Sequence, residues 1–272
     1  MLDAKVWYED GATVVAAVAL GVSLVSSVIS SWYTKNKDKD TAHLDLRTVL
    51  QRLLQLPKES MDLRDKYKDR EAGERDSLVA MGDNLLWMEK TFLTSQGAVL
   101  ARKLGPKLVS APEYLTLSRA QGDVFNITAQ HEFIDHACQT ANTANDAITA
   151  LQEAGGFQFA RGHFDDGRAS VRKALQVFDT YKGYDAGTVA VTYARSHLYW
   201  AQLERGHGHY TETNQQLEQA AEVMANAPVT PNGEIVKQQI AGFWAGGTTG
   251  APQVTNPVKP PVAAATIPGA NG

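Results

Sequence analysis

A stretch of 24 residues without a charged side chain, from Gly11 to Thr34, limits this chain more than any other part of it. As an α-helix it would be about 36 Å long, which is enough to cross a hydrocarbon core of about 30 Å. An aromatic pair stands at each end, Trp7-Tyr8 and Trp32-Tyr33. Such rings favour the headgroup layer of a bilayer, so the sequence predicts a transmembrane helix over residues 11–34.

Basic residues near the two ends predict the orientation of this helix. Only Lys5 precedes it, whereas four basic residues follow it: Lys35, Lys37, Lys39 and Arg47. Basic residues collect on the cytoplasmic side, so we expect the N-terminus outside and the bulk of the chain in the cytoplasm. Two other interpretations stay open. A cleaved signal peptide would need a more basic start and a shorter apolar core, and a helix buried in a folded domain rarely has an aromatic pair at both ends.

Small residues occupy one face of the predicted span at four-residue intervals: Ala19, Ser23, Ser27 and Ser31. Small side chains let two helices approach closely, and serine hydroxyls form hydrogen bonds across the contact. This face favours self-association into a homo-oligomer. The alternative is that small residues are simply common in this stretch.

Composition excludes several classes of protein. A hydrophobic fraction of 43% excludes wholesale disorder, and a formal charge of −4 argues against a nucleic-acid partner. A single cysteine, Cys138, excludes a disulfide framework and a thiolate zinc cluster.

Apolar residues recur at helical intervals after residue 40, without an alternating strand pattern, so we expect an all-α fold. Residues 41–110 are predicted to form linker and capping helices. We expect one helix to run from Thr41 and end at Pro57, because proline interrupts a helix. A charged connector over residues 58–76 follows, and then two further helices over 78–92 and 100–108, the second ending near Gly105-Pro106.

Three short stretches further along resemble one another: Gln121–Val124, Arg161–Phe164 and Gly208–Tyr210. In the last two, a glycine opens the turn and an aromatic residue stands two positions later. An alanine follows ten residues after each aromatic, and a small residue stands seven positions before each glycine: Ala174, Ala220, Gly155 and Ala201. These small residues allow two antiparallel helices to pack closely while the aromatic residue fills the gap. The first stretch has Val124 in the place of the aromatic.

Residues 111–228 thereby resemble the tetratricopeptide repeat (TPR) family, whose unit is a helix–turn–helix. The turns are about 40 and 46 residues apart rather than 34, and residues 181–187 are the expected insertion. The resemblance implies a superhelix of stacked hairpins with a concave groove that binds a protein or peptide partner. A short helix over Gly233–Trp244 is expected to cap the stack, because a terminal unit has no neighbour on one side.

In that family the first helix of each unit lines the groove. The resemblance therefore implies that six residues contact a partner: Tyr114, Arg119, Gln158, Arg161, Arg195 and Tyr199. The leading hypothesis is a membrane-anchored TPR-like adaptor or scaffold. The alternatives are a secreted or periplasmic TPR-like binding or assembly factor, and an enzyme within a helical fold.

Motifs for chemistry are weak. Residues His131–His136 approach the HExxH zinc motif, but the second histidine is five residues from the first instead of four, so the two do not share a helix face. Only His131 and Asp135 share one, and two ligands make a weak metal site. No glycine-rich phosphate loop occurs. We therefore expect no catalytic residue, no cofactor and no metal.

The predicted organisation has four parts. Residues 1–40 form the transmembrane anchor and its flank, 41–110 the linker and capping helices, and 111–245 the TPR-like repeats with their capping helix. Residues 246–272, rich in Pro, Gly and Ala, are expected to form a disordered tail, because they bury too little apolar surface to offset the cost of ordering.

Overall fold

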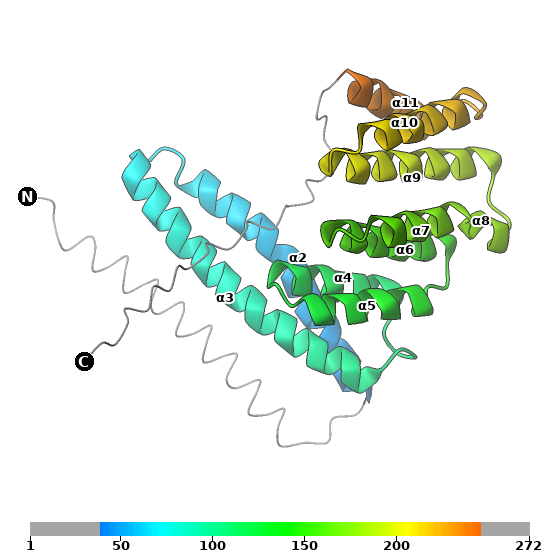
Figure 1. Ribbon diagram of the computed structural model, residues 1–272. Helices are drawn as coiled ribbons and strands as arrows, with labels where there is room; N and C mark the ends of the chain where they lie inside the picture. The colour runs from blue at the N-terminus through cyan, green and yellow to red at the C-terminus, as the bar shows by residue number, and fades with distance from the viewer. Residues whose placement is uncertain (1–38, 246–272) are drawn as a thin grey trace, which may run out of the picture. The chain divides into compact units, whose positions relative to one another are not determined.

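The computed structural model describes residues 39–245 (Figure 1). Within this range 83% of residues are helical and none lies in a strand, which confirms the predicted all-α fold. The predicted membrane span, its small-residue face and the C-terminal tail lie outside the described residues. No helix between Lys39 and Trp244 is both long enough and apolar enough to span a membrane.

The described residues form two compact units. The first holds residues 39–184 together with 202–209, and the second holds 185–201 together with 210–245. The division falls within the predicted repeat region, and helix α9 (Ala186–Gly206) contributes residues to both units.

The first unit begins with a long antiparallel hairpin of α2 (Lys39–Lys66) and α3 (Ala72–Leu104) (Figure 1). Two predictions about it were wrong. Helix α2 continues through Pro57, and α3 is one helix where two were expected. Contacts on both sides of Pro57 keep α2 helical. Arg52, before the proline, pairs with Glu59 about two turns later and also with Glu89 of α3. Helix α3 ends before Gly105, as expected, where the backbone takes a φ of 72°.

Two shorter hairpins follow in the same unit. The first consists of α4 (Ala111–Asp123) and α5 (Ile127–Thr140), and the second of α6 (Ala144–Ala160) and α7 (Phe164–Leu175), followed by the single turn α8 (Val177–Thr180). A large core joins α2 to α5 around Leu46, Leu100, Tyr114 and Phe133. A smaller apolar cluster joins α6, α7 and α8 around Ile148 and Val177.

Glu113 fastens α4 to α2. One carboxylate oxygen accepts hydrogen bonds of 2.8 Å from both the backbone N–H and the hydroxyl of Ser110, which caps α4. The other oxygen lies 3.2 Å from His43 Nε2 and 3.3 Å from Arg47 Nε, both on α2. Burial alone would raise the pKa of Glu113, but these donors outweigh it and hold that pKa below its usual value.

The second unit contains residues 186–201 of α9 packed on α10 (Tyr210–Ala225) and α11 (Pro231–Trp244). Helix α11 confirms the short helix expected after Pro231. Its buried side chains are Val236 and Ile240, whereas Ile235 and Trp244 are exposed. His197 of α9 donates from Nδ1 to Gln216 Oε1 of α10 at 2.8 Å, and its burial lowers its pKa.

The second and third predicted turns are confirmed, while the first lies slightly later than predicted, at residues 124–125; all three share one hydrogen-bond pattern. In each, one residue takes a left-handed conformation: Phe125, Gly162 and Gly208, which we call the turn residues. The following N–H donates to the carbonyl five residues earlier, with N···O distances of 2.9, 2.9 and 3.0 Å. The turn residue's own N–H donates to the carbonyl three residues earlier. All three helices therefore end in a Schellman motif.

This pattern corrects the alignment of the first repeat. The residue equivalent to Gly162 is Phe125, not Gly122, and the residue equivalent to Phe164 is Ile127, not Val124. A glycine was predicted at this turn because glycine tolerates a positive φ best. Here a phenylalanine adopts a φ of 59° instead.

With the corrected register, the spacing of small residues extends to all three hairpins. Seven positions before the turn residue stand Ser118, Gly155 and Ala201, and twelve positions after it stand Ala137, Ala174 and Ala220. Nine positions after it stand apolar residues: Ile134, Val171 and Leu217. All nine residues are buried. The chain thus repeats a packing pattern as well as a turn.

At the second hairpin this pattern brings two helices into close contact. A Cβ atom added to Gly155 would lie 2.7 Å from Cγ2 of Val171 and 3.2 Å from the carbonyl oxygen of Gly167. A Cβ added to Gly167 would lie 2.5 Å from the ring of Phe159. Glycine at both positions lets α6 and α7 approach closely enough to share a core.

Replacement of Gly155 by alanine tests this packing. We expect overpacking to cost about 1–3 kcal/mol, partly offset by about 1 kcal/mol from the better helix propensity of alanine. The net loss in the free energy of unfolding, measured by urea denaturation, should be up to about 2 kcal/mol. The control is Gly73→Ala, where no atom lies within 4 Å of the added Cβ. That variant should be unchanged or slightly more stable, and equal stability of both variants would contradict the close approach.

Candidate interaction surface

The six predicted partner-binding residues divide between the two units. Tyr114, Arg119, Gln158 and Arg161 lie in the first unit, and Arg195 and Tyr199 in the second. Tyr114 is only 1% exposed, with its ring centroid 5.9 Å from that of Phe133. Its ring is part of the core and is not available to a partner. Arg195 is exposed and Tyr199 half-buried.

Arg119 and Arg161 are both exposed on the first unit, one in the second half of α4 and one just after α6. Arg119 donates from Nε to the carboxylate of Glu153 on α6 at 2.7 Å. The guanidinium of Arg161 lies over the ring of Phe157, 5.5 Å from its centroid. Gln158 is engaged by its own turn, since its side-chain oxygen lies 3.2 Å from Nδ1 of His163.

Three of these side chains share one face of α6, since Glu153, Phe157 and Arg161 follow one another at four-residue intervals. His131 of α5 stacks on Phe157 with an angle of 5° between the rings and 5.1 Å between their centroids. We call these four residues with Arg119 the α6 face. Glu153 and Phe157 were not predicted from the sequence, although their four-residue intervals to Arg161 were visible there.

A buried ion pair joins α7 to the end of α9 within the first unit. The guanidinium of Arg168 donates to both carboxylate oxygens of Glu204, at 2.8 and 3.0 Å. Glu204 is fully buried, and its Oε2 lies 2.8 Å from Nδ1 of His209. Nothing in the sequence alone identified this pair, because it depends on which hairpins meet.

Aromatic rings cover the same place. The ring of Phe164 meets that of His209 edge-on, with centroids 4.6 Å apart, and also contacts Phe159 and His207. Phe164 therefore fills the space that the sequence predicted for it. Tyr210, its counterpart in the last hairpin, is 67% exposed and does not fill such a space, which corrects the prediction for that residue.

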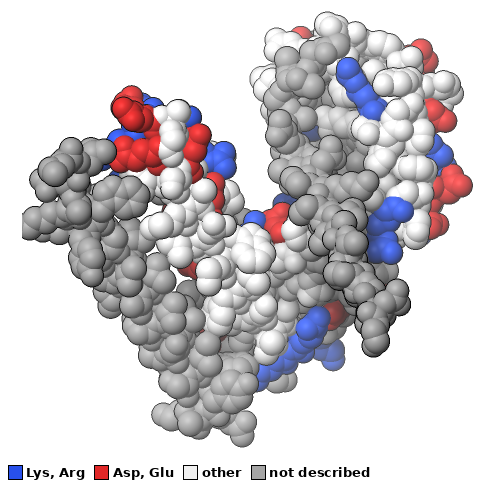
Figure 2. All heavy atoms as spheres, turned by 60° about the vertical axis from the view of Figure 1, so that its left-hand side comes forward, with Lys and Arg blue, Asp and Glu red and all other residues white. Residues whose placement is uncertain are grey.

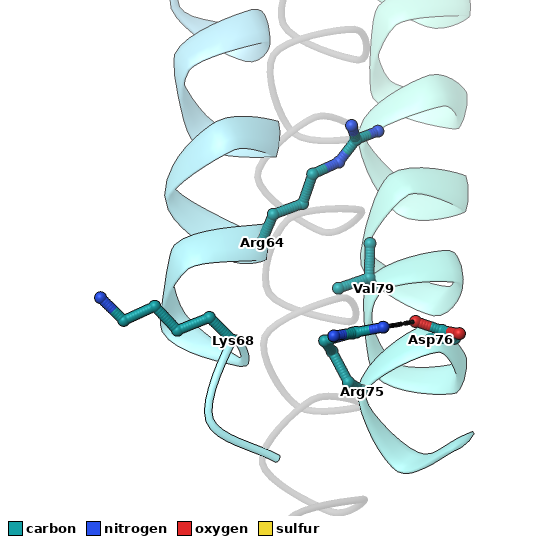
Figure 3. Close-up of a pocket in the computed structure, with 5 residues that line it drawn as sticks. All are labelled: Arg64, Lys68, Arg75, Asp76 and Val79. Atoms are coloured by element: carbon teal, nitrogen blue, oxygen red, sulfur yellow. Dashed lines mark hydrogen bonds and ion pairs between the residues drawn. The ribbon is translucent and has the colours of Figure 1, made fainter. Parts of the chain in front are cut away.

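A shallow pocket of about 300 Å³ lies at the tip of the α2–α3 hairpin, lined by Arg64, Lys68, Arg75, Asp76 and Val79 (Figure 3). Its charges are largely balanced, because Arg75 pairs with Asp76 at 3.0 Å and Arg64 with Asp83 at 3.2 Å. Lys68 points away from the other four residues in Figure 3. The pocket offers no concentrated charge that would select an anion.

His131 and Asp135, the candidate metal ligands, lie close to each other but have no third ligand among residues 39–245. His131 Nε2 lies 3.7 Å from Asp135 Oδ2, and no group of three or more His, Cys, Asp or Glu side chains in residues 39–245 is arranged to hold a metal. The thiol of Cys138 is half-buried, and this burial, with the charge of Asp135, raises its pKa. A raised pKa lowers the thiolate fraction and the reactivity of this cysteine.

No family model, curated protein or solved structure matches this chain. The surface is therefore interpreted from its own residues.

The ion pair between Arg168 and Glu204 makes a testable prediction about stability. Glu204→Gln leaves a largely buried guanidinium with only the exposed carboxylate of Asp165, 3.2 Å away, and we expect a loss of about 3–5 kcal/mol in the free energy of unfolding. The control is Glu234→Gln, which removes an exposed pair with Lys237 and should cost about 0–1 kcal/mol. Equal effects in urea denaturation would mean that the buried pair does not hold the hairpins together.

Proposed function

We propose that this chain is a membrane-anchored TPR-like adaptor that binds a protein partner on the cytoplasmic side of a bilayer. The observation that carries this proposal is the threefold recurrence of one helical hairpin, with the same turn and the same buried small residues. A single hairpin of this kind cannot bury its apolar face alone, so stacking is the expected consequence.

The contacts between successive hairpins of the first unit support a stacked arrangement. Arg119 of α4 pairs with Glu153 of α6, and His131 of α5 stacks on Phe157 of α6. The next junction uses the same part of the hairpin, since His131 and Arg168 each stand six positions after their turn residue. Stacked repeats generally present extended surfaces for binding other proteins.

We assign partner binding to the α6 face. Arg161 has no carboxylate within salt-bridge distance among residues 39–245, so its charge is available to a partner. A guanidinium that lies on an aromatic ring is held in orientation and donates well to a carboxylate. The partner segment that fits this face carries an acidic side chain.

The proposed anchor is the uncharged segment 11–34, four residues before α2 begins. An anchor so close to α2 would keep the hairpins near the bilayer surface, where a docked partner is held at high local concentration.

Site-specific photo-crosslinking in cells tests the surface. With benzoylphenylalanine at position 119 or 161, we expect crosslinks to one common partner, because both positions border the α6 face. The control is position 173, an exposed lysine on α7, which should give no such product. Arg161→Glu should reduce the crosslink at position 119 about tenfold, by repelling an acidic segment. Equal products from positions 119 and 173, or no effect of Arg161→Glu, would contradict this surface.

Protease added to intact cells tests the location. We expect residues 39–245 to stay protected until the cell membrane is opened, because basic residues follow the predicted span. Cleavage of this region in intact cells would instead favour the secreted or periplasmic alternative.

A further inference from the structure

Helix α3 carries a line of apolar side chains that does not face α2. The line follows alternating three- and four-residue intervals, and Ser95 interrupts it between its last two apolar members. These members are Leu78, Met81, Leu85, Met88, Phe92 and Val99. We call this line the α3 seam. This interval is the one by which a helix packs against a second helix in a coiled coil.

The residues of α3 that meet α2 are different ones. Gly82 faces Leu63, Glu89 pairs with Arg52, and Gly97 faces Val49. At 100° per residue, these contacts lie roughly 110° around the helix from the α3 seam. The seam is therefore a second apolar side of α3.

The α3 seam is substantially open to solvent. Met81 is 43% exposed, Met88 is 63% exposed and Val99 is 48% exposed, while Leu85 and Phe92 are half-buried. Figure 2 shows charged side chains of both signs gathered at the tip of the α2–α3 hairpin, and a largely uncharged surface below it. Ser95 interrupts the line and Phe92 packs partly against the core, but the exposed Met81, Met88 and Val99 leave apolar surface of the kind that is typical of a contact site.

We propose that the α3 seam is the docking site of residues 11–34 of the same chain when no bilayer holds them. The lengths agree. From Leu78 to Val99 the seam extends about 32 Å, and 24 helical residues extend about 36 Å.

The connection also agrees. Residues 35–38 span at most about 14 Å, which is enough to cross one helix–helix distance of about 8–10 Å at the end where α2 begins. Val49 of α2 faces Gly97 of α3, so this end of α2 lies beside the Val99 end of the seam. The segment would run parallel to α3.

The segment has a face that fits. As a helix, the segment would have one mainly apolar face with the same alternating four- and three-residue intervals. This face consists of Val14, Val18, Gly21, Val25, Val28 and Trp32. Its small polar residues, Ser23, Ser27 and Ser31, lie on the opposite side of the helix. A helix with one valine face and one serine face suits contact with protein on one side and water on the other. The proposal does not depend on the α6 face, and it adds to the proposed anchor a state in which the protein itself covers the segment.

Hydrogen exchange on the full chain, without detergent or lipid, tests this docking. We expect amides 14–32 to be protected, and Val18→Glu or Val25→Glu to speed their exchange at least about tenfold. The matched control variants are Ser23→Glu and Ser27→Glu, which place the same charge on the opposite face and should keep the protection. Equal exchange of these amides in all four variants would contradict docking through the valine face.

Changes on α3 give a second measurement. Met88→Glu should release amides 14–32, whereas Met61→Glu, at a position 66% exposed on α2, should not. Sedimentation should give the mass of a monomer. Unprotected amides 14–32 in the wild-type chain, protection that follows a concentration-dependent dimer, or a chain that stays in solution only with detergent or vesicles would each overturn the proposal.

Discussion

Close approach of paired helices is the constraint on which the rest of this structure depends. Where α6 crosses α7, Gly155 and Gly167 leave so little room that an added Cβ would overlap a side chain of the opposite helix. Alanine or serine takes the place of Gly155 in the other hairpins. Because the helices lie so near each other, Val171 and Ala174 are core residues, with 0% and 1% of their surface exposed. In three of the hairpins a left-handed residue closes the turn between the helices.

Charged residues add specific contacts between neighbouring hairpins. Arg102 of α3 donates to Glu132 of α5 at 2.9 and 2.6 Å, and this pairing lowers the pKa of Glu132. Lys90 of α3 similarly lies 2.5 Å from Asp123 of α4. One large apolar core joins the α2–α3 and α4–α5 hairpins, and ion pairs of opposite charge add to the contact between them.

Much of the helical arrangement could be predicted from the sequence because it depends on local patterns. Gly162 and Gly208 marked two turns, and Ala174 and Ala220 marked the buried face of the following helices. Pro57 misled the prediction, since the loss of one backbone donor was outweighed by the contacts of α2 with α3. The first turn was misaligned because Phe125 adopts a conformation in which glycine is expected.

The candidate surface was less predictable, because it combines residues from several helices. Arg161 was identified, but Phe157 beneath it was not, and Tyr114 was assigned to the surface although it is buried. The helical period shows which residues share a face. It does not show which face another hairpin covers, and the pair of Arg168 with Glu204 arises only from that contact.

The pair of Arg168 with Glu204 also encodes the order of the hairpins. The position of Glu204, four residues before the turn residue, holds glutamine in the other two hairpins, Gln121 and Gln158. A transposed hairpin would therefore offer Arg168 an amide in place of a carboxylate. Asp165 of the same hairpin also contacts that guanidinium at 3.2 Å, but its side chain is 98% exposed, so the buried carboxylate comes from the last hairpin and favours the native order over a permuted one.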